Sequence, residues 1–128
     1  MKRLALLSLL FLLAVACDRK EVHMPERLLS EQEMISIMTD LQIIEADINY
    51  QKTQEHEQQE KDSVKIAPKD YIKMSRDYYA QLFEHYGITD SIFSQNMRYY
   101  TERPDVLEKI MDSVLQRLTK EQSTSSIQ

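Results

Sequence analysis

The segment His56-Glu57-Gln58-Gln59-Glu60 comes nearest in this chain to a metal-dependent catalytic motif. The zinc-protease helix motif has two histidines four residues apart, so that both imidazoles bind one zinc ion while the glutamate beside the first acts as a base. Here Glu60 stands where the second histidine would be. A solvated, charged helix face accounts for these residues, and we predict no metal site.

Cys17 is the only cysteine of the chain, and its position indicates modification. A basic start precedes an apolar run from Leu4 to Leu13 and then small residues, which is the layout of a secretory signal peptide. The run is shorter than the roughly 20 apolar residues that a membrane-spanning helix needs. The ending Ala14-Val15-Ala16-Cys17 resembles the bacterial lipobox. We therefore expect removal of residues 1–16, with Cys17 as a lipidated anchor whose acyl chains enter a membrane.

Glu45 lies beside Ile44 and Ile48, at the edge of a stripe of apolar residues with helical spacing. Burial of an unpaired carboxylate costs several kcal/mol. Two interpretations stay open for this residue. Glu45 reaches water at the margin of the stripe, or it pairs with an arginine such as Arg98 or with tyrosine hydroxyl groups and thereby fixes the helix register.

Tyrosine dominates the aromatic content, with seven residues, four of which form two adjacent pairs. Neighbouring helical side chains point about 100° apart, so each pair should offer one ring to the core and the other to the surface. Exposed tyrosines suit contacts with other proteins, whereas core packing is the alternative. The candidate interaction residues are Tyr78, Tyr79, Tyr99, Tyr100 and Glu45.

The sequence contains no Ser-His-Asp pattern, phosphate-binding loop or Cys-x-x-Cys pair. The other two histidines, His23 and His85, have no partner at ligand spacing. We therefore predict no catalytic residues and no cofactor site, and we expect that the protein is not an enzyme.

The composition favours an all-α fold. A chain of 128 residues fits one small domain, and its single glycine and three prolines leave few residues for the tight turns of a sheet. We predict a small bundle of about four helices in residues 28–118. A cleaved signal peptide (1–16) and a lipid-anchored tether (17–27) precede it, and a disordered polar tail (119–128) follows it.

Capping signals locate the first two helices. Ser30 and Glu33 fit a capping box that starts a helix at about Glu31. That helix passes Tyr50, and the charged residues 51–65 either prolong it or form a loop.

A second helix is expected to start from Pro68, since proline suits the first turn of a helix. Gly87 should end that helix as its C-cap, because glycine adopts the left-handed conformation without strain.

The last two helices are expected to follow at once. Thr89 is the predicted N-cap of the third helix, which stops before Pro104. Asp105 and Glu108 repeat the capping-box spacing, so we predict that they start a strongly amphipathic fourth helix that ends at Leu118.

The chain is acidic, with a formal net charge of −5. Removal of residues 1–16 takes away Lys2 and Arg3, which leaves 14 positive and 21 negative side chains, or −7. This charge disfavours nucleic acid as a partner and disfavours broad binding to anionic lipid headgroups.

Two stretches, MPERLLSEQEMISIMTDLQIIEAD and DYYAQLFEHYGITDSIFSQNMRYYTERPDVLEKIMDSVLQRL, resemble the DUF4296 family of uncharacterised lipoproteins from Bacteroidetes-type bacteria. The shared features are Pro25, Glu45-Ala46, the turn Tyr86-Gly87-Ile88-Thr89 with Phe93, Tyr99-Tyr100 with Pro104, and the final helix Val106–Leu118. The resemblance implies an envelope lipoprotein and brings no activity with it.

These observations together favour a lipid-anchored, non-enzymatic interaction or accessory subunit of the cell envelope. We expect it at the outer membrane facing the periplasm, with surface exposure as an open alternative. Its expected partner is an envelope protein, and a homo-oligomer is also open. The alternative function is a small-ligand binder or hydrolase that uses a tyrosine-lined cleft with Glu45.

Overall fold

A computed structural model describes residues 24–62 and 69–125 of the chain. These residues form four α-helices and no strand, which confirms the all-α prediction. The helices are α2 (Glu31–Asp62), α3 (Tyr71–His85), α4 (Asp90–Thr101) and α5 (Pro104–Ser125). The predicted signal peptide and Cys17 lie outside the described residues.

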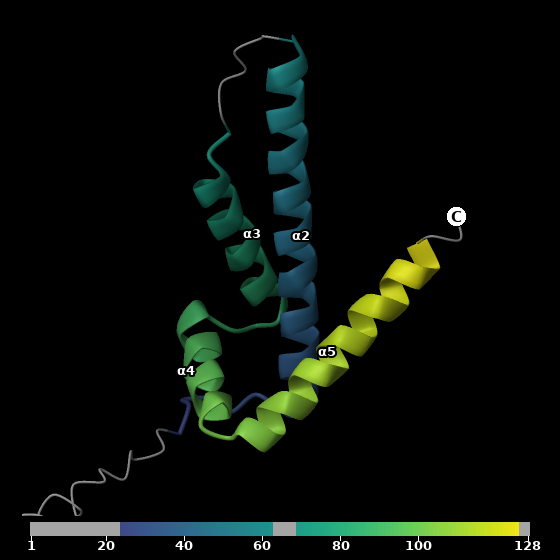
Figure 1. Ribbon diagram of the computed structural model, residues 1–128. Helices are drawn as coiled ribbons and strands as arrows, with labels where there is room; N and C mark the ends of the chain where they lie inside the picture. Colours follow the sequence, from purple (N-terminus) through teal and green to yellow (C-terminus); the bar gives the residue numbers. More distant parts are fainter. Residues whose placement is uncertain (1–23, 63–68, 126–128) are drawn as a thin grey trace, which may run out of the picture.

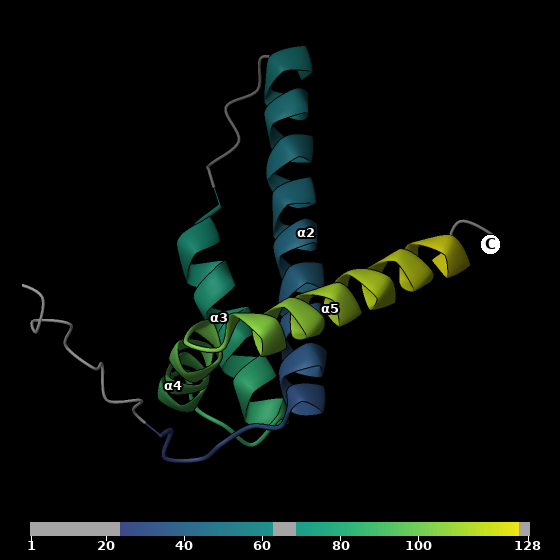
Figure 2. The ribbon, with the colours of Figure 1, turned by 60° about the horizontal axis from the view of Figure 1, so that its bottom comes forward.

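The long helix α2 is the axis of the molecule (Figure 1). Helix α3 runs antiparallel beside it, and the short helix α4 lies below α3. Helix α5 packs against α4 and crosses the lower part of α2, and it then diverges from α2 so that the two helices form an open V. Figure 2 shows the same divergence from a second direction. None of the described helices is long and apolar enough to span a bilayer.

The hydrophobic core occupies the lower end, where all four helices meet. Its most buried members come from the segment before α2 and from every helix. They are Leu29, Met34, Ile35, Ile37, Phe83, Ile88, Tyr100, Ile110 and Val114. The upper part of α2 lies beyond this core cluster.

Helix α2 begins with the predicted capping box. The Ser30 hydroxyl oxygen accepts from the Glu33 backbone N–H at 3.2 Å, and the Glu33 carboxylate accepts from the Ser30 backbone N–H at 2.8 Å. These bonds to Ser30 hold the pKa of Glu33 below its ordinary value. The helix then continues to Asp62, so residues 51–62 are helix rather than loop.

Helix α3 begins at Tyr71, and Asp70 is its N-cap, with a carboxylate that accepts from the Lys73 backbone N–H at 2.9 Å. The start predicted from Pro68 lies outside the described residues.

The turn after α3 agrees with prediction. Gly87 has a φ of +63°, and its N–H donates to the Glu84 carbonyl at 2.9 Å. The Ile88 N–H donates to the Phe83 carbonyl, also at 2.9 Å, which completes a Schellman motif. The Thr89 hydroxyl then caps α4 by accepting from the Ile92 N–H at 3.2 Å. Gly87 therefore closes α3 at the position after its C-cap residue, Tyr86, and Thr89 is the N-cap of α4 as predicted.

Two expectations for α5 are corrected. The helix already begins at Pro104, and the N–H groups of Val106 and Leu107 donate to the Arg103 carbonyl. Asp105 therefore lies inside the first turn and is not the N-cap of a capping box, because proline occupies the first helical position, where no N–H is needed.

The helix also passes Leu118 and ends at Ser125, so residues 119–125 of the predicted disordered tail are helical. Lys120, Glu121 and Gln122 are good helix formers and continue the helix.

Candidate functional site

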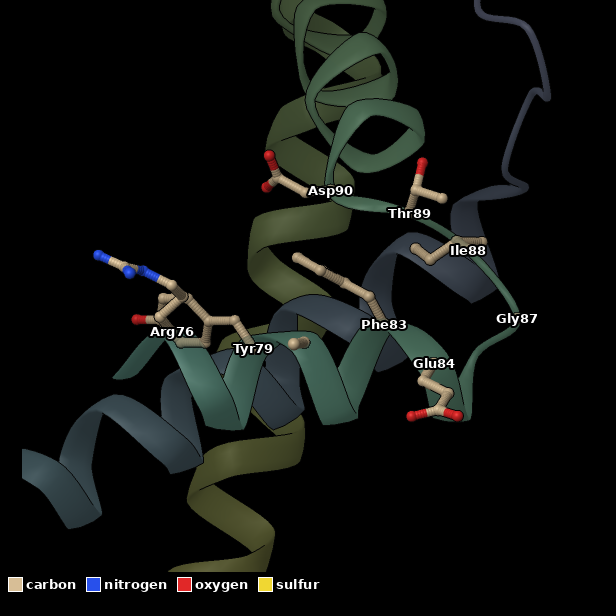
Figure 3. Close-up of a pocket in the computed structure, with 9 residues that line it drawn as sticks. Arg76, Tyr79, Phe83, Glu84, Gly87, Ile88, Thr89 and Asp90 are labelled. Carbon is tan, nitrogen blue, oxygen red and sulfur yellow. The ribbon is translucent and has the colours of Figure 1, made fainter. Parts of the chain in front are cut away.

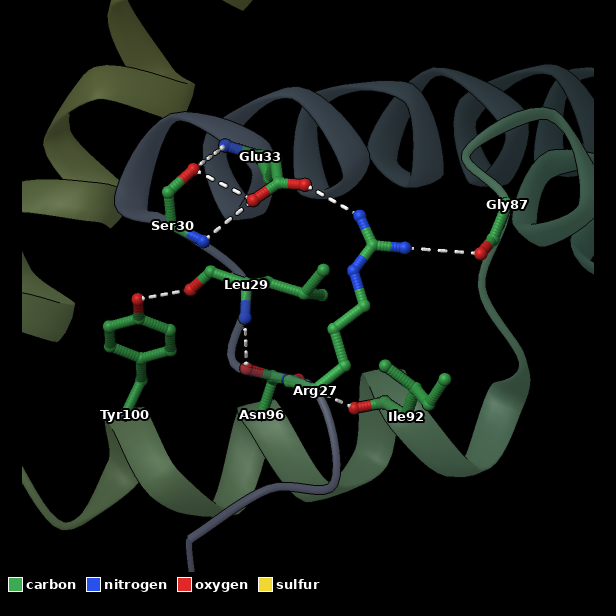
Figure 4. A network of polar contacts seen from close by, with 8 residues as sticks. All are labelled: Arg27, Leu29, Ser30, Glu33, Gly87, Ile92, Asn96 and Tyr100. Carbon is green, nitrogen blue, oxygen red and sulfur yellow. Dashed lines mark hydrogen bonds and ion pairs between the residues drawn. The ribbon is translucent and has the colours of Figure 1, made fainter.

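A short N-terminal strap, residues 24–30, is bound to α4 by a buried amide (Figure 4). The side chain of Asn96 is fully buried. Its oxygen accepts from the Leu29 N–H at 2.8 Å, and its nitrogen donates to the carbonyls of Arg27 at 2.7 Å and Ile92 at 2.8 Å. The Tyr100 hydroxyl donates to the Leu29 carbonyl at 2.6 Å. Asn96 and Tyr100 therefore satisfy strap groups that would otherwise be buried without partners.

Arg27 extends the attachment of the strap to two further elements. Its guanidinium donates to the Gly87 carbonyl at 3.1 Å and forms an ion pair with Glu33 at 2.9 Å. The Glu26 N–H also donates to the Gln95 side chain at 2.8 Å. Residues 26 and 27 are thus part of the domain, which corrects their assignment to the tether.

The pair Tyr99 and Tyr100 is only partly at the surface. Tyr100 is 5% exposed and belongs to the core, so it is removed from the candidate interaction surface. Burial also raises the pKa of its hydroxyl. Tyr99 is half-buried, meets Tyr100 edge-on, and carries the Arg103 guanidinium 3.6 Å from its ring centroid. Both rings therefore have partners within the domain.

On α3, the side chain of Tyr78 is exposed, whereas Tyr79 is half-buried and packs against the core. Tyr79 and Tyr78 therefore divide between the domain interior and the surface, as adjacent helical residues should. The four candidate tyrosines lie on two helices, and Tyr79 alone among them lines the groove described below.

Glu45 is half-buried, and within the described residues it forms no bond with Arg98 or with a tyrosine hydroxyl. Another carboxylate of α2, that of Asp40, does bond to a tyrosine: it accepts from the hydroxyl of Tyr86, the C-cap residue of α3, at 2.6 Å. Burial and this hydrogen bond raise the pKa of Tyr86 to about 12. The register contact expected of Glu45 is therefore made by a carboxylate earlier in α2.

The upper part of α2 is connected to the start of α3 by charged groups. Lys69 pairs with Glu55 at 2.8 Å, and this bond holds the pKa of Glu55 below its ordinary value. The neighbouring His56 is exposed. No group of three or more His, Cys, Asp or Glu residues in residues 24–62 and 69–125 could hold a metal ion.

An open groove of about 690 Å³ lies between α3 and the start of α4 (Figure 3). Phe83 and Ile88 form its floor and are almost fully buried. The complete lining is Arg76, Tyr79, Ala80, Phe83, Glu84, Gly87, Ile88, Thr89 and Asp90. The Gly87 turn creates the groove, because it reverses the chain and sets the first turn of α4 opposite the end of α3.

Three charged side chains stand at the rim of the groove. Figure 3 shows Arg76 and Glu84 at opposite ends of the α3 wall, with Asp90 on the facing wall toward the Arg76 side, and the Glu84 carboxylate points away from Phe83. Arg76 and Glu84 are eight residues apart, or about 12 Å along the helix. All three are exposed, and none forms a hydrogen bond or ion pair with another described residue. An apolar floor with free charges at its rim suits binding of a peptide segment.

The sequence predicted only Tyr79 among the groove residues. The available signal was the sequence Phe83 to Ile88 around the single glycine, since a Schellman motif brings the residues on either side of it together. The rim charges carried no such signal, because they look like any solvated helix face.

Comparison with known proteins finds a match to a family model. The model of a domain of unknown function, DUF4296, matches residues 25–124. No curated protein and no solved structure matches the chain. The match begins in the strap that Asn96 holds and ends in the last turns of α5, and it includes all four described helices. The chain therefore belongs to the DUF4296 family.

Proposed function

We propose that this protein is a lipid-anchored, non-enzymatic interaction subunit of the cell envelope, held at the outer membrane by acyl chains on Cys17. Its helical domain offers the α3–α4 groove to an envelope protein. The observation that carries this proposal is the groove itself, which combines a buried apolar floor with a charged rim of exposed side chains. Binding surfaces commonly have this composition.

The length of chain between Cys17 and the helical domain is short enough to keep the groove near a membrane. Seven peptide steps separate Cys17 from Met24, and a fully extended chain covers at most about 25 Å over that length. Met24 begins the strap, which Asn96 and Tyr100 fasten to α4. A lipid on Cys17 would therefore keep the groove, at the start of α4, close to the membrane surface, where a partner in the same envelope layer can reach it.

The alternative function, a ligand binder or hydrolase in a tyrosine-lined cleft with Glu45, has weaker support. Tyr79 lines the groove, but Glu45 is not among its lining residues. The cleft and the carboxylate that this alternative requires are thus separate.

The test is chemical crosslinking in native membranes with a groove-blocking variant. Ala80→Arg places a long charged side chain in the groove, and Gln81→Arg, at the next exposed position of α3, is its control. We expect a discrete adduct in the wild type and in Gln81→Arg that is lost in Ala80→Arg. An adduct that survives Ala80→Arg would refute the role of the groove, and one with twice the mass of the chain would indicate a homo-oligomer instead.

The anchor is tested separately with Cys17→Ser. The wild type should incorporate radioactive palmitate and sediment with membranes, whereas the variant should do neither. Palmitate labelling of Cys17→Ser would disprove lipidation at this residue.

A further inference from the structure

We infer that the N-terminal strap docks on the lipid surface that holds the Cys17 anchor. The side chains of Met24 and Leu28 enter the boundary between lipid headgroups and acyl chains, and the Arg98 guanidinium binds a lipid phosphate. This inference rests on the proposed lipid anchor and adds the orientation of the domain on its membrane. It is drawn from the exposed apolar residues of the strap, from the bonds that hold the strap to α4, and from the cation beside it.

The strap exposes two apolar side chains to solvent. Met24 is 64% exposed and Leu28 is 45% exposed, whereas their neighbour Leu29 is fully buried. Entry into the apolar part of a lipid surface would remove both exposed side chains from water. Single exposed apolar residues are common on folded domains, so the inference depends on where these two residues lie.

The chain length places both residues close to the proposed anchor. Seven peptide steps from Cys17 reach Met24, and a fully extended chain covers at most about 25 Å over that length. Among the described residues, the next exposed large apolar side chain along the chain is Ile43, on α2. Because the anchor would make contact between strap and lipid intramolecular, a contact too weak to bind a free domain can still form.

The strap reaches the lipid in a fixed position. The Leu29 N–H donates to the Asn96 side chain at 2.8 Å, and the Leu29 carbonyl accepts from the Tyr100 hydroxyl at 2.6 Å (Figure 4). Figure 1 shows the strap at the lower end of the molecule, from which α2 extends to the upper end. Docking through the strap would therefore direct the far end of α2, which is 32 residues or about 48 Å long, away from the membrane.

Arg98 supplies a charge that complements the lipid. A small pocket of about 240 Å³ lies beside Met24 and is lined also by Ser91, Ser94, Gln95 and Arg98. The Arg98 guanidinium is exposed and forms no hydrogen bond or ion pair with another described residue. Guanidinium groups bind phosphate oxygens through two parallel hydrogen bonds. An apolar side chain with a cation beside it is the composition of an interfacial anchor.

The acidity of the chain does not oppose this contact. Charges more than about 8 Å from the lipid are largely screened at physiological ionic strength. Within the strap, Arg27 is paired with Glu33 at 2.9 Å. The exposed charges that remain next to Met24 are Glu26 and Arg98, which have opposite signs. The strap therefore suits a lipid surface without net charge.

Single tryptophans test the inference, because the chain contains no tryptophan of its own. Met24→Trp is the reporter. Tyr50→Trp is its matched control, since both native side chains are 64% exposed and Tyr50 lies about 28 Å along α2 from Glu31. The full lipidated chain would be placed in vesicles of phosphatidylcholine and phosphatidylethanolamine that carry bromine on the upper acyl carbons. Bromine quenches tryptophan emission on contact.

Brominated lipid should lower the emission of Met24→Trp at least about twofold, because an interfacial side chain lies about 5–10 Å deep, at the level of the bromine atoms. The emission of Tyr50→Trp should not change. Leu28→Trp is a second reporter and should also be quenched. Circular dichroism would verify that each variant is folded.

The phosphate contact is tested in the Met24→Trp protein. Arg98→Glu should reduce the quenching at least about twofold, since a partly exposed charge contact changes sign. Arg76→Glu makes the same change of charge on α3 and should leave the quenching as it was. Quenching that is insensitive to Arg98→Glu would refute the contact between Arg98 and lipid phosphate.

Sedimentation with the vesicles separates failure of the inference from failure of the proposed anchor. If the protein sediments but neither Met24→Trp nor Leu28→Trp is quenched, the strap does not dock and the anchor stands. Equal quenching of Tyr50→Trp would mean that no face of the domain is preferred, and a blue shift without quenching would mean that protein, such as a second copy, covers the strap. Either result would overturn the inference. If the wild type does not sediment, the anchor itself is wrong and the inference falls with it.

Discussion

Replacement of Asn96 by alanine should detach the strap from α4. The Asn96 side chain is fully buried and makes three hydrogen bonds, to the Leu29 N–H and to the carbonyls of Arg27 and Ile92. Alanine makes none of them. Leu29 is itself fully buried, so its N–H would lose its acceptor where water cannot replace it.

The expected cost follows from these bonds. A buried donor without an acceptor costs about 1–3 kcal/mol, and the loss of the two bonds to carbonyls adds about 1 kcal/mol between them. We therefore expect Asn96→Ala to lower the free energy of unfolding by about 2–4 kcal/mol. Small domains have only about 5–15 kcal/mol in total. The melting temperature should fall by at least about 8 °C.

Urea unfolding followed by circular dichroism would measure this change in the full chain. Gln95→Ala is the matched control, because Gln95 makes an exposed bond to the strap through the Glu26 N–H. Water can replace that bond, so we expect a loss below about 1 kcal/mol. Trypsin under native conditions gives a second readout, since a released strap should be cut faster after Arg27. If Asn96→Ala unfolds within about 1 kcal/mol of the wild type, the strap is not held by this amide and the reasoning fails.

Three further predictions concern the caps and the interhelical contact. Gly87→Ala should lower the free energy of unfolding in urea by about 1–2 kcal/mol, because φ at this position is +63°. No atom lies within 4 Å of the added methyl group, so only backbone strain acts. An unchanged free energy of unfolding would contradict the left-handed turn. Ser30→Ala should cost about 1 kcal/mol at pH 7. Its effect should shrink as the pH falls below 4.5, since the bonds to Ser30 lower the pKa of Glu33 and the part of the capping box made by the carboxylate is lost when that carboxylate is protonated. A pH-independent difference would argue against the capping box. The wild type should lose stability as the pH rises from 10 to about 12, because folding raises the pKa of the Tyr86 hydroxyl from 10.0 to about 12 and the folded state therefore holds this proton more tightly than the unfolded chain. Tyr86→Phe should make this loss smaller. Urea unfolding at several pH values would measure the change, and an unchanged slope would contradict the contact with Asp40.

The strap would connect the proposed anchor at Cys17 to α4. Because Asn96 and Tyr100 join it to the core, a pull on Cys17 would reach α4 directly through residues 24–30. The groove begins at the other end of α4, at Thr89 and Asp90. Release of the strap should therefore increase the reach of the groove from the membrane, and it would remove the bond from Arg27 to the Gly87 carbonyl in the groove lining.

The helix termini were predictable where one or two local bonds define them. Ser30 with Glu33, Gly87 and Thr89 each bond to groups within five residues in the chain, so their residue types carry the information. The same rules misplaced the start of α5. Proline at the first helical position and aspartate at the N-cap are competing signals, and residue spacing does not show which one prevails.

Side-chain partners across helices were not predictable in the same way. Asp40 and Glu45 both lie on α2 near apolar residues, and only the packing of α3 places the Tyr86 hydroxyl next to Asp40, 46 residues away in the chain. Tyr99 and Tyr100 are chemically identical, and the strap, 71 residues earlier in the chain at Leu29, covers Tyr100.

The sequence by itself determined the helices, their caps at Ser30, Gly87 and Thr89, and membership of a family of helical domains. Each depends on interactions within a few residues or on the period of apolar side chains, which are properties of a linear chain. Only the tertiary structure decided which tyrosine is buried, that the strap is part of the domain, and that Arg76, Glu84 and Asp90 surround one groove. These features depend on contacts between distant segments, and such contacts exist only after the helices have packed.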